Sequence, residues 1–291
     1  MMPVWGFAVV IESNVDDVPV GDRLFGYFPP ASHLNLTPTN IGPLRLVDGA
    51  EHRAQLPQGY NTYYRVKAEP GYDPANDDLR MLLWPLHITS FFLWDFLQDA
   101  DWFGAAQVII VSASSKTSIG LAYALDDDAT APPAVAVTSA RNLDFVKELG
   151  LYAQSISYDS LTEIDATIPA VIVDMSGNGE VLGQLHTHLG ENMKRCINVG
   201  LTHWDEGLTA EGINKDRSEF FFAPAHIQRR MQDWGPDGFA QKTSSFMQAT
   251  ALKSRAWLEL KRIDGLQGLA DIYGDVCQGR LSPAEGLIIE L

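Results

Sequence analysis

The N-terminal part of the chain alternates short apolar runs with turn-forming residues. Apolar runs at residues 5–11, 23–28 and 63–66 predict β-strands. Turn signals such as Asp16-Asp17 and Pro29-Pro30 separate them. The pattern therefore predicts a β-rich segment.

The middle of the chain has a different pattern, in which solid apolar runs alternate with helical periodicity. The runs that predict strands lie at residues 108–113, 134–138, 170–174 and 196–200, and the predicted helices lie at 118–125, 143–149 and 181–189. Asn142 is a candidate N-cap for the second helix, and Gly150 is its stop signal. Apolar strands with helices between them are typical of a parallel sheet covered on both faces. This pattern predicts an α/β fold with a doubly wound, Rossmann-like nucleotide domain.

The rest of the chain predicts connecting and terminal elements. A buried helix is expected at residues 81–94, a long amphipathic helix at 239–263, a further helix at 266–277 and a last strand at 287–291. A stretch rich in proline, glycine and aspartate at residues 69–78 reads as a hinge. We therefore expect a domain boundary within this stretch.

Composition narrows the classes of partner. The 291 residues are 46% hydrophobic and carry a formal net charge of −16, which suits globular domains but repels phosphate backbones and anionic lipid. We therefore expect neither nucleic acid nor a membrane as partner. With 2 cysteines there is no disulfide framework, and no basic residue precedes Arg23, so a cytoplasmic location is expected.

The turn after the first apolar run of the nucleotide domain is a candidate pyrophosphate site. It contains Ser114, Ser115, Lys116 and Thr117 and ends at Gly120, without a complete GxGxxG. Hydroxyls and one lysine can bind phosphate oxygens, and Gly120 would allow close packing of helix and strand. The alternative is a solvated loop with an exposed lysine.

The end of the second strand suggests which dinucleotide binds. An NAD-type fold places an acid there, about 20 residues after the glycine turn, against the ribose 2′-hydroxyl. This chain instead has Thr138, Ser139, Arg141 and Asn142, and no carboxylate before Asp144. Hydroxyls and a guanidinium suit a 2′-phosphate, so NADP(H) is the expected cofactor. In the alternative interpretation Asn142 only caps a helix and Arg141 is a surface charge.

The ends of the third and fourth strands supply the remaining candidates. Ser176 follows one strand, and Gly200, Thr202 and His203 follow the other. Small and polar residues at these strand ends would line the nicotinamide side of the site. Ordinary turns after strands have a similar composition.

Several stretches resemble the medium-chain dehydrogenase/reductase superfamily, within it the quinone oxidoreductase-like branch. Residues 20–28 (VGDRLFGYF) look like the turn and strand of its GroES-like domain, and residues 60–66 (YNTYYRV) like another strand of that domain. The helix with Thr89-Ser90 is similar to the superfamily's segment that enters the nucleotide domain. Residues 268–291 are similar to its C-terminal segment. The Ser-Ser-Lys-Thr turn, with Thr-His-Trp after the fourth strand, looks more like the DUF2855 family.

The resemblance implies a GroES-like domain at 1–79, completed by 255–291, and a Rossmann-like NADPH-binding domain at 80–254. Two features depart from the superfamily pattern. The AxxGxxG turn keeps Ala113 but has Lys116 in place of its middle glycine. The chain also begins inside the expected barrel, so we expect the GroES-like domain to be partial, with its N-terminal strands missing. A homodimer joined through the sheet edges of the nucleotide domains is a further implication.

Candidate catalytic groups are few. The zinc-ligand pattern of the superfamily is missing, so no metal is expected, and His186 and His188 are spaced for different helix faces. Tyr60 and Tyr63 could donate a hydrogen bond to an enolate, although strand tyrosines more often pack in a core. No catalytic residue is assigned.

The resulting hypothesis is a zinc-free, NADPH-dependent oxidoreductase that transfers hydride to an activated C=C bond or a quinone or carbonyl substrate. The alternative is a non-catalytic NADPH-binding or regulatory protein of the same fold. In either case a small molecule is the expected ligand.

Overall fold

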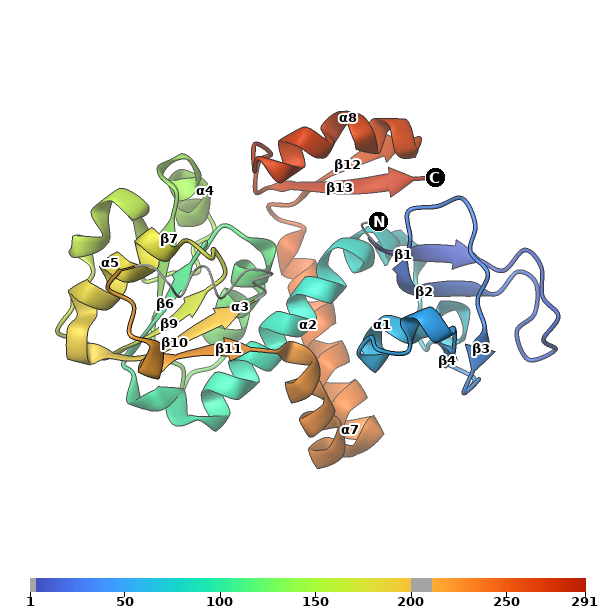
Figure 1. Cartoon of the computed structure of the whole chain (residues 1–291), viewed down its shortest axis with the longest axis horizontal. Helices are drawn as coiled ribbons and strands as arrows, with labels where there is room; N and C mark the ends of the chain where they lie inside the picture. The colour runs from blue at the N-terminus through green and yellow to red at the C-terminus, as the bar shows by residue number, and fades with distance from the viewer. Residues whose placement is uncertain (1–3, 200–210) are drawn as a thin grey trace. The chain divides into compact units, whose positions relative to one another are not determined.

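A computed structural model describes residues 4–199 and 211–291 (Figure 1). The chain divides into two compact units, one formed by residues 1–85 and 258–291 and the other by residues 86–257. The first division falls inside the helix α2 (Asp77–Asp99). The second falls in the segment between α7 (Ala223–Ser254) and β12 (Glu259–Asp264).

The first unit contains an antiparallel sheet with the strand order β1-β2-β5-β4-β3. These strands are β1 (Val4–Val9), β2 (Arg23–Phe28), β3 (Pro38–Thr39), β4 (Arg45–Asp48) and β5 (Thr62–Arg65), and the short helix α1 (Gln58–Asn61) precedes β5. Alternate residues of β2 point to opposite faces of the sheet, so Leu24 and Phe28 join a core with Leu46 and Tyr63. The arrangement confirms the predicted GroES-like β-rich region.

The same unit contains a parallel strand pair with a helix between the strands. β12 pairs in parallel with β13 (Glu285–Glu290), and α8 (Gly265–Cys277) connects them. The predicted helix 239–263 is therefore wrong at its C-terminal end, because residues 259–264 form a strand. The helical pattern of α7 ends at Ser254, and the backbone of β12 pairs with a strand that is distant in the sequence.

The second unit is a doubly wound parallel sheet with the order β11-β10-β9-β6-β7-β8. Its strands are β6 (Gln107–Val111), β7 (Ala134–Thr138), β8 (Gln154–Ser157), β9 (Ala170–Asp174), β10 (Met193–Val199) and β11 (Ser218–Phe221). Counted along the chain, this is the 3-2-1-4-5-6 order of Rossmann folds. The predicted α/β fold is confirmed.

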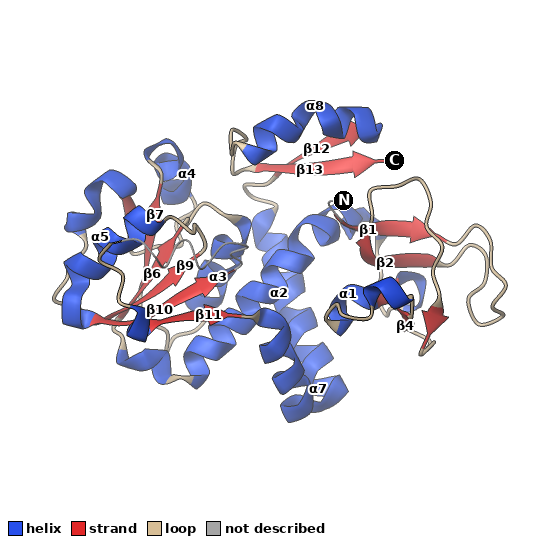
Figure 2. Cartoon of the chain, viewed as in Figure 1, coloured by secondary structure: helices blue, strands red, loops and turns tan. Residues whose placement is uncertain are grey.

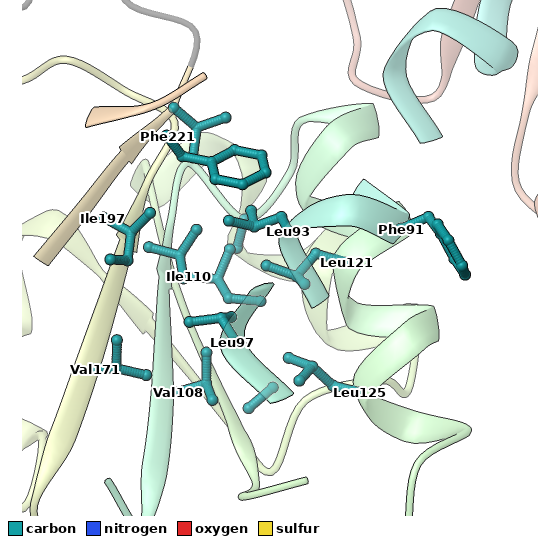
Figure 3. Packing of buried hydrophobic residues seen from close by; sticks show 14 of the residues in the cluster. Phe91, Leu93, Leu97, Val108, Ile110, Leu121, Leu125, Val171, Ile197 and Phe221 are labelled. Carbon is teal, nitrogen blue, oxygen red and sulfur yellow. The ribbon is translucent and has the colours of Figure 1, made fainter. Parts of the chain in front are cut away.

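Helices cover both faces of this sheet (Figure 2). The connecting helices are α3 (Lys116–Asp126), α4 (Leu143–Glu148) and α5 (Gly179–Leu189). One core contains Val108 and Ile110 of β6 together with Leu121 of α3, as Figure 3 shows, whereas Ile109 and Val111 pack on the other face with α5. Because both faces are buried, β6, β7 and β9 are apolar at all but one terminal position each, which explains the solid runs in the sequence.

The remaining elements are short 3-10 helices. They are η1 (Glu51–Arg53), η2 (Val66–Ala68), η3 (Pro74–Asn76), η4 (Asp101–Gly104), η5 (Ala140–Asn142), η6 (Tyr158–Glu163), η7 (Gly190–Asn192) and η8 (Lys215–Arg217). Among the described residues no helix is long and apolar enough to cross a membrane.

Candidate functional site

The candidate site lies where the strand order of the parallel sheet reverses. β6 has β7 on one side and β9 on the other, and the chain leaves the carboxyl ends of β6 and β9 toward opposite faces. In open α/β sheets ligands bind at this switch point. The connections after the two neighbouring strands run to opposite faces of the sheet there and leave a crevice between them. The predicted phosphate turn follows β6, and Ser176 follows β9.

The turn after β6 brings the chain sharply into α3. Ser112 has a φ of 63°, which is unusual for a residue with a side chain. Ser115 is the N-cap of α3, and its hydroxyl accepts a hydrogen bond from the Ser118 N–H at 3.2 Å. The amide of Thr117 lies in the first turn, where a helix has no internal acceptor for its N–H groups. This helix N-terminus is a suitable anion site.

Three of the predicted residues bind one another. The Ser114 hydroxyl accepts hydrogen bonds from Thr138 Oγ1 at 3.3 Å and from Asn142 Nδ2 at 3.0 Å. Ser114 and Thr138 are buried, so they join the ends of β6 and β7 and do not present their hydroxyls to solvent. Asn142 stands at the N-cap of α4, as predicted, but its side chain bonds Ser114 and makes no cap hydrogen bond.

The other predicted residues of the first two strand ends remain accessible. Lys116 and Thr117 are partly exposed in the first turn of α3, and Ser139 is partly exposed directly after β7. Arg141 is exposed in η5. The end of β7 therefore carries a hydroxyl and a guanidinium, with Asp144 as the next acid along the chain. Phosphate binding by these side chains stays a prediction.

Ser176 belongs to a hydrogen-bonded turn that the sequence did not reveal. Its hydroxyl donates to Asp174 Oδ1 at 2.6 Å, and the N–H of Gly177 donates to Asp174 Oδ2 at 3.1 Å. Burial raises the pKa of Asp174, and these donors oppose that rise. Because the Ser176 proton is already donated to Asp174, the hydroxyl is available to a ligand mainly as an acceptor.

Tyr158 and Met175 contact the turn after β6 and the start of α3, and the sequence did not single them out. Burial and the nearby Asp174 carboxylate raise the pKa of Tyr158, which interacts with Ser112. The Ser118 hydroxyl lies 3.1 Å from the sulfur of Met175. Both residues stand just beyond strand ends, and that position is the one signal in the sequence that could have identified them.

Gly120 fulfils a different role from the one predicted. A Cβ on Gly120 would lie 2.6 Å from Ser90 Oγ and 2.7 Å from His87 Cδ2, and both residues belong to α2. The glycine thus allows α3 to approach a helix, whereas the sequence predicted close packing on a strand. Ser90 Oγ donates to the carbonyl of Thr117 at 2.7 Å, so this contact also holds the first turn of α3.

We expect Gly120→Ala to lower the free energy of unfolding by about 1–3 kcal/mol, because the added methyl overpacks this contact. Gly274→Ala is the matched control, since Gly274 lies within α8 and an added methyl group would have no heavy atom within 4 Å. The control should be neutral or stabilising. Urea denaturation measures both, and equal stabilities for the two variants would contradict the packing role.

The structure does not place the remaining candidates, and it separates the two histidines of α5. Gly200, Thr202 and His203 lie outside the described residues. His186 Nδ1 accepts from the Asn214 N–H at 3.0 Å and His188 Nε2 bonds the Ile164 carbonyl at 2.8 Å, so the two rings make separate structural contacts. Within residues 4–199 and 211–291, no group of three or more His, Cys, Asp or Glu side chains could hold a metal ion.

The fold is similar to that of several solved oxidoreductase structures. The quinone oxidoreductase from Coxiella burnetii is 16% identical, with a TM-score of 0.56, and the match covers 99% of this chain and 78% of that one. The yhdH oxidoreductase from Salmonella enterica, determined with NADP, is 12% identical, with a TM-score of 0.53 and coverages of 98% and 80%. CurA from Vibrio vulnificus, determined with NADPH, is 10% identical, with a TM-score of 0.54 and coverages of 99% and 88%. At such identities the likeness establishes the fold.

The sequence, in contrast, identifies the family of the chain. Residues 1–282 match the model of the family described as "Protein of unknown function (DUF2855)", and the chain belongs to this family. No curated protein matches the chain significantly.

Proposed function

We propose that this protein is an NADP(H)-dependent oxidoreductase that transfers hydride to an activated C=C bond or a quinone or carbonyl group without a catalytic metal. The observation that carries the proposal is the composition of the switch point. A helix N-terminus with a hydroxyl-rich turn faces a neighbouring strand end that has Ser139 and Arg141 and no acid. Hydroxyls, an ammonium and a guanidinium form a donor set that suits a phosphorylated dinucleotide.

Each part of the site would bind a different part of the cofactor. The first turn of α3, with Thr117 and Lys116, would hold the pyrophosphate through N–H groups, hydroxyl and charge. Ser139 and Arg141 would hold the 2′-phosphate of the ribose. The Ser114–Thr138–Asn142 cluster fixes the two strand ends relative to each other, so it positions the groups that bind.

The bound nicotinamide supplies the hydride in this chemistry. The chain's own contribution is to bind the nucleotide, orient it and exclude water, and this needs little acid–base help. The structural neighbours determined with NADP or NADPH agree with the choice of cofactor.

Titration with NADPH and with NADH, followed by tryptophan fluorescence, tests the cofactor. We expect NADPH to bind more tightly, and we expect Arg141→Ala to weaken NADPH binding by about 1.5–3 kcal/mol because one charge-assisted phosphate contact is lost. NADH binding should barely change. Lys147→Ala, which removes an exposed charge from α4, is the control and should leave both affinities unchanged. Equal affinities of the wild type for NADPH and NADH would contradict the proposal.

A second candidate is a non-catalytic NADPH-binding or regulatory protein. It is favoured by the hydrogen bonding of Asp174 and Ser176 to each other, which leaves no evident proton donor at that strand end. A panel of enones and quinones separates the two functions, since tight NADPH binding without turnover of any acceptor would favour the second. We also propose a homodimer in which the sheets of two copies meet edge to edge. β11 is an edge strand of the parallel sheet and could form this contact.

A further inference from the structure

A buried group of side chains in the second unit contacts the first turn of α3, which belongs to the candidate pyrophosphate site. Ser90 Oγ donates to the carbonyl of Thr117 at 2.7 Å, and the ring of His87 interacts with the backbone of Lys116. Thr250 of α7 holds this ring through a hydrogen bond of 3.0 Å between its Oγ1 and His87 Nδ1. His87, Ser90 and Thr250 are each 0% exposed. We name these three residues the buried clamp.

The clamp lies within one unit of the chain and carries no charge at neutral pH. Its residues and α3 all belong to the unit of residues 86–257. Burial lowers the pKa of His87 to about 4, so its ring is neutral at about pH 7. Ser90 Oγ has a second acceptor, the Leu86 carbonyl at 3.2 Å, but the Thr117 carbonyl is closer and takes the stronger bond. The clamp therefore acts on the turn through neutral hydrogen bonds.

The planar peptide bond transmits these contacts to the N–H groups that a phosphate would meet. The carbonyl of Lys116 and the N–H of Thr117 belong to one peptide plane, and the carbonyl of Thr117 shares the next plane with the N–H of Ser118. The Thr117 N–H has no acceptor within the helix, whereas the Ser118 N–H bonds the N-cap Ser115. Fixing each carbonyl fixes the direction of the N–H in its plane, and a carbonyl that accepts a hydrogen bond also makes that N–H a stronger donor.

We propose that His87, Ser90 and Thr250 are positioning residues for the pyrophosphate of the dinucleotide, a proposal that rests on the NADP(H) binding proposed above. Because they are fully buried, they act through the turn and not by contact with the nucleotide. A turn that is already held in its binding orientation loses little conformational freedom when the ligand binds. NADPH and NADH both contain the pyrophosphate, so the clamp should affect the two equally, whereas Arg141 should distinguish them.

Calorimetric titration of the full chain with NADPH, NADH and adenosine 2′-monophosphate tests this role. Ser90→Ala removes a buried donor and should weaken both dinucleotides by the same factor, about fivefold. Thr250→Val removes the hydroxyl that holds His87 and should weaken both about threefold. Adenosine 2′-monophosphate lacks a pyrophosphate, so neither variant should change its affinity. A merely structural defect would weaken all three ligands.

The chain offers a matched control for each variant. Ser254→Ala removes another buried hydroxyl, which has no hydrogen-bond partner among the described residues. Thr243→Val removes a buried hydroxyl of α7 that bonds carbonyls of its own helix, the nearer being that of Phe239 at 2.8 Å. Both controls should leave every affinity unchanged. Thr250→Ser keeps the hydroxyl and should bind both dinucleotides as the wild type does.

The outcomes separate this role from the proposed function. Dinucleotide affinities of Ser90→Ala and Thr250→Val equal to those of their controls would overturn the positioning role and leave NADP(H) binding in place. An equal loss for adenosine 2′-monophosphate would also overturn it. If the wild type binds neither dinucleotide, the proposed function fails, and inorganic pyrophosphate becomes the probe. Pyrophosphate binding that falls in these two variants but not in the controls would then support the clamp, and absent or unchanged binding would overturn it.

Discussion

Replacing Asp95 by alanine is expected to lower the free energy of unfolding by about 3 kcal/mol. Asp95 Oδ2 accepts hydrogen bonds from His226 Nε2 and from Arg230 Nε, both at 2.6 Å, and so joins α2 to α7. The three side chains are 9%, 7% and 10% exposed. Without the carboxylate, the Arg230 guanidinium would remain almost buried and would lose its shortest partner, which is costly because water cannot replace that partner.

The expected loss lies at the low end for a buried ion pair because Arg230 keeps two other acids. Its Nη2 lies 3.0 Å from Asp99, and its Nη1 lies 3.1 Å from Asp233. Asp99→Ala is the matched control, since that side chain is 40% exposed and its removal should cost about 1 kcal/mol or less. Urea denaturation at neutral pH measures both variants. A loss in Asp95→Ala no larger than that in Asp99→Ala would show that the buried pair does not stabilise the unit.

Acidification from about pH 7 to about pH 5 is expected to cost roughly 2 kcal/mol of stability for each of two buried histidines. Burial lowers the pKa of His87 and of His186 from 6.5 to about 4. The unfolded chain therefore takes up protons at these positions below about pH 6.5, while the folded chain does not until about pH 4. Since the unfolded state binds more protons in that interval, stability falls as the pH falls. Asp174 opposes this trend, because burial raises its pKa.

The contacts of the two rings explain why the folded state keeps them neutral. His186 Nδ1 must be unprotonated to accept the N–H of Asn214. His87 is fully buried and shares a hydrogen bond of 3.0 Å with Thr250 Oγ1. Protonating either ring would place a charge in surroundings that offer no compensating acid in the described contacts.

Urea denaturation at both pH values, for the wild type and for His186→Gln, tests this dependence. The variant should lose about 2 kcal/mol less than the wild type on acidification, because glutamine does not titrate. His52→Gln, at an exposed position of η1, is the control and should keep the wild-type dependence. An unchanged loss in His186→Gln would show that His186 is not a source of the pH effect.

The sequence by itself determined the strands that are buried on both faces of their sheet. The predicted strands 134–138 and 170–174 coincide with β7 and β9, because central strands of a parallel sheet form nearly continuous apolar runs. The predicted strand 23–28 coincides with β2. The place of the hydroxyl-rich turn at the end of a strand followed from these runs, whereas the switch point needed the strand order of the structure.

Tertiary structure alone decided which strands lie at the edges of the sheet and which residues distant in the sequence contact each other. β8 and β11 lie at the two edges of the sheet, and each begins with two polar residues and has one exposed position, so neither is a solid apolar run. The pairing of β12 with β13 and the contact of Gly120 with α2 join residues far apart in the chain, and no local pattern encodes such contacts. The partner of Asn142 is also not encoded locally, because its side-chain amide can bond either the N–H groups of a helix end or a serine hydroxyl. Only the packed strand ends place Ser114 within its reach.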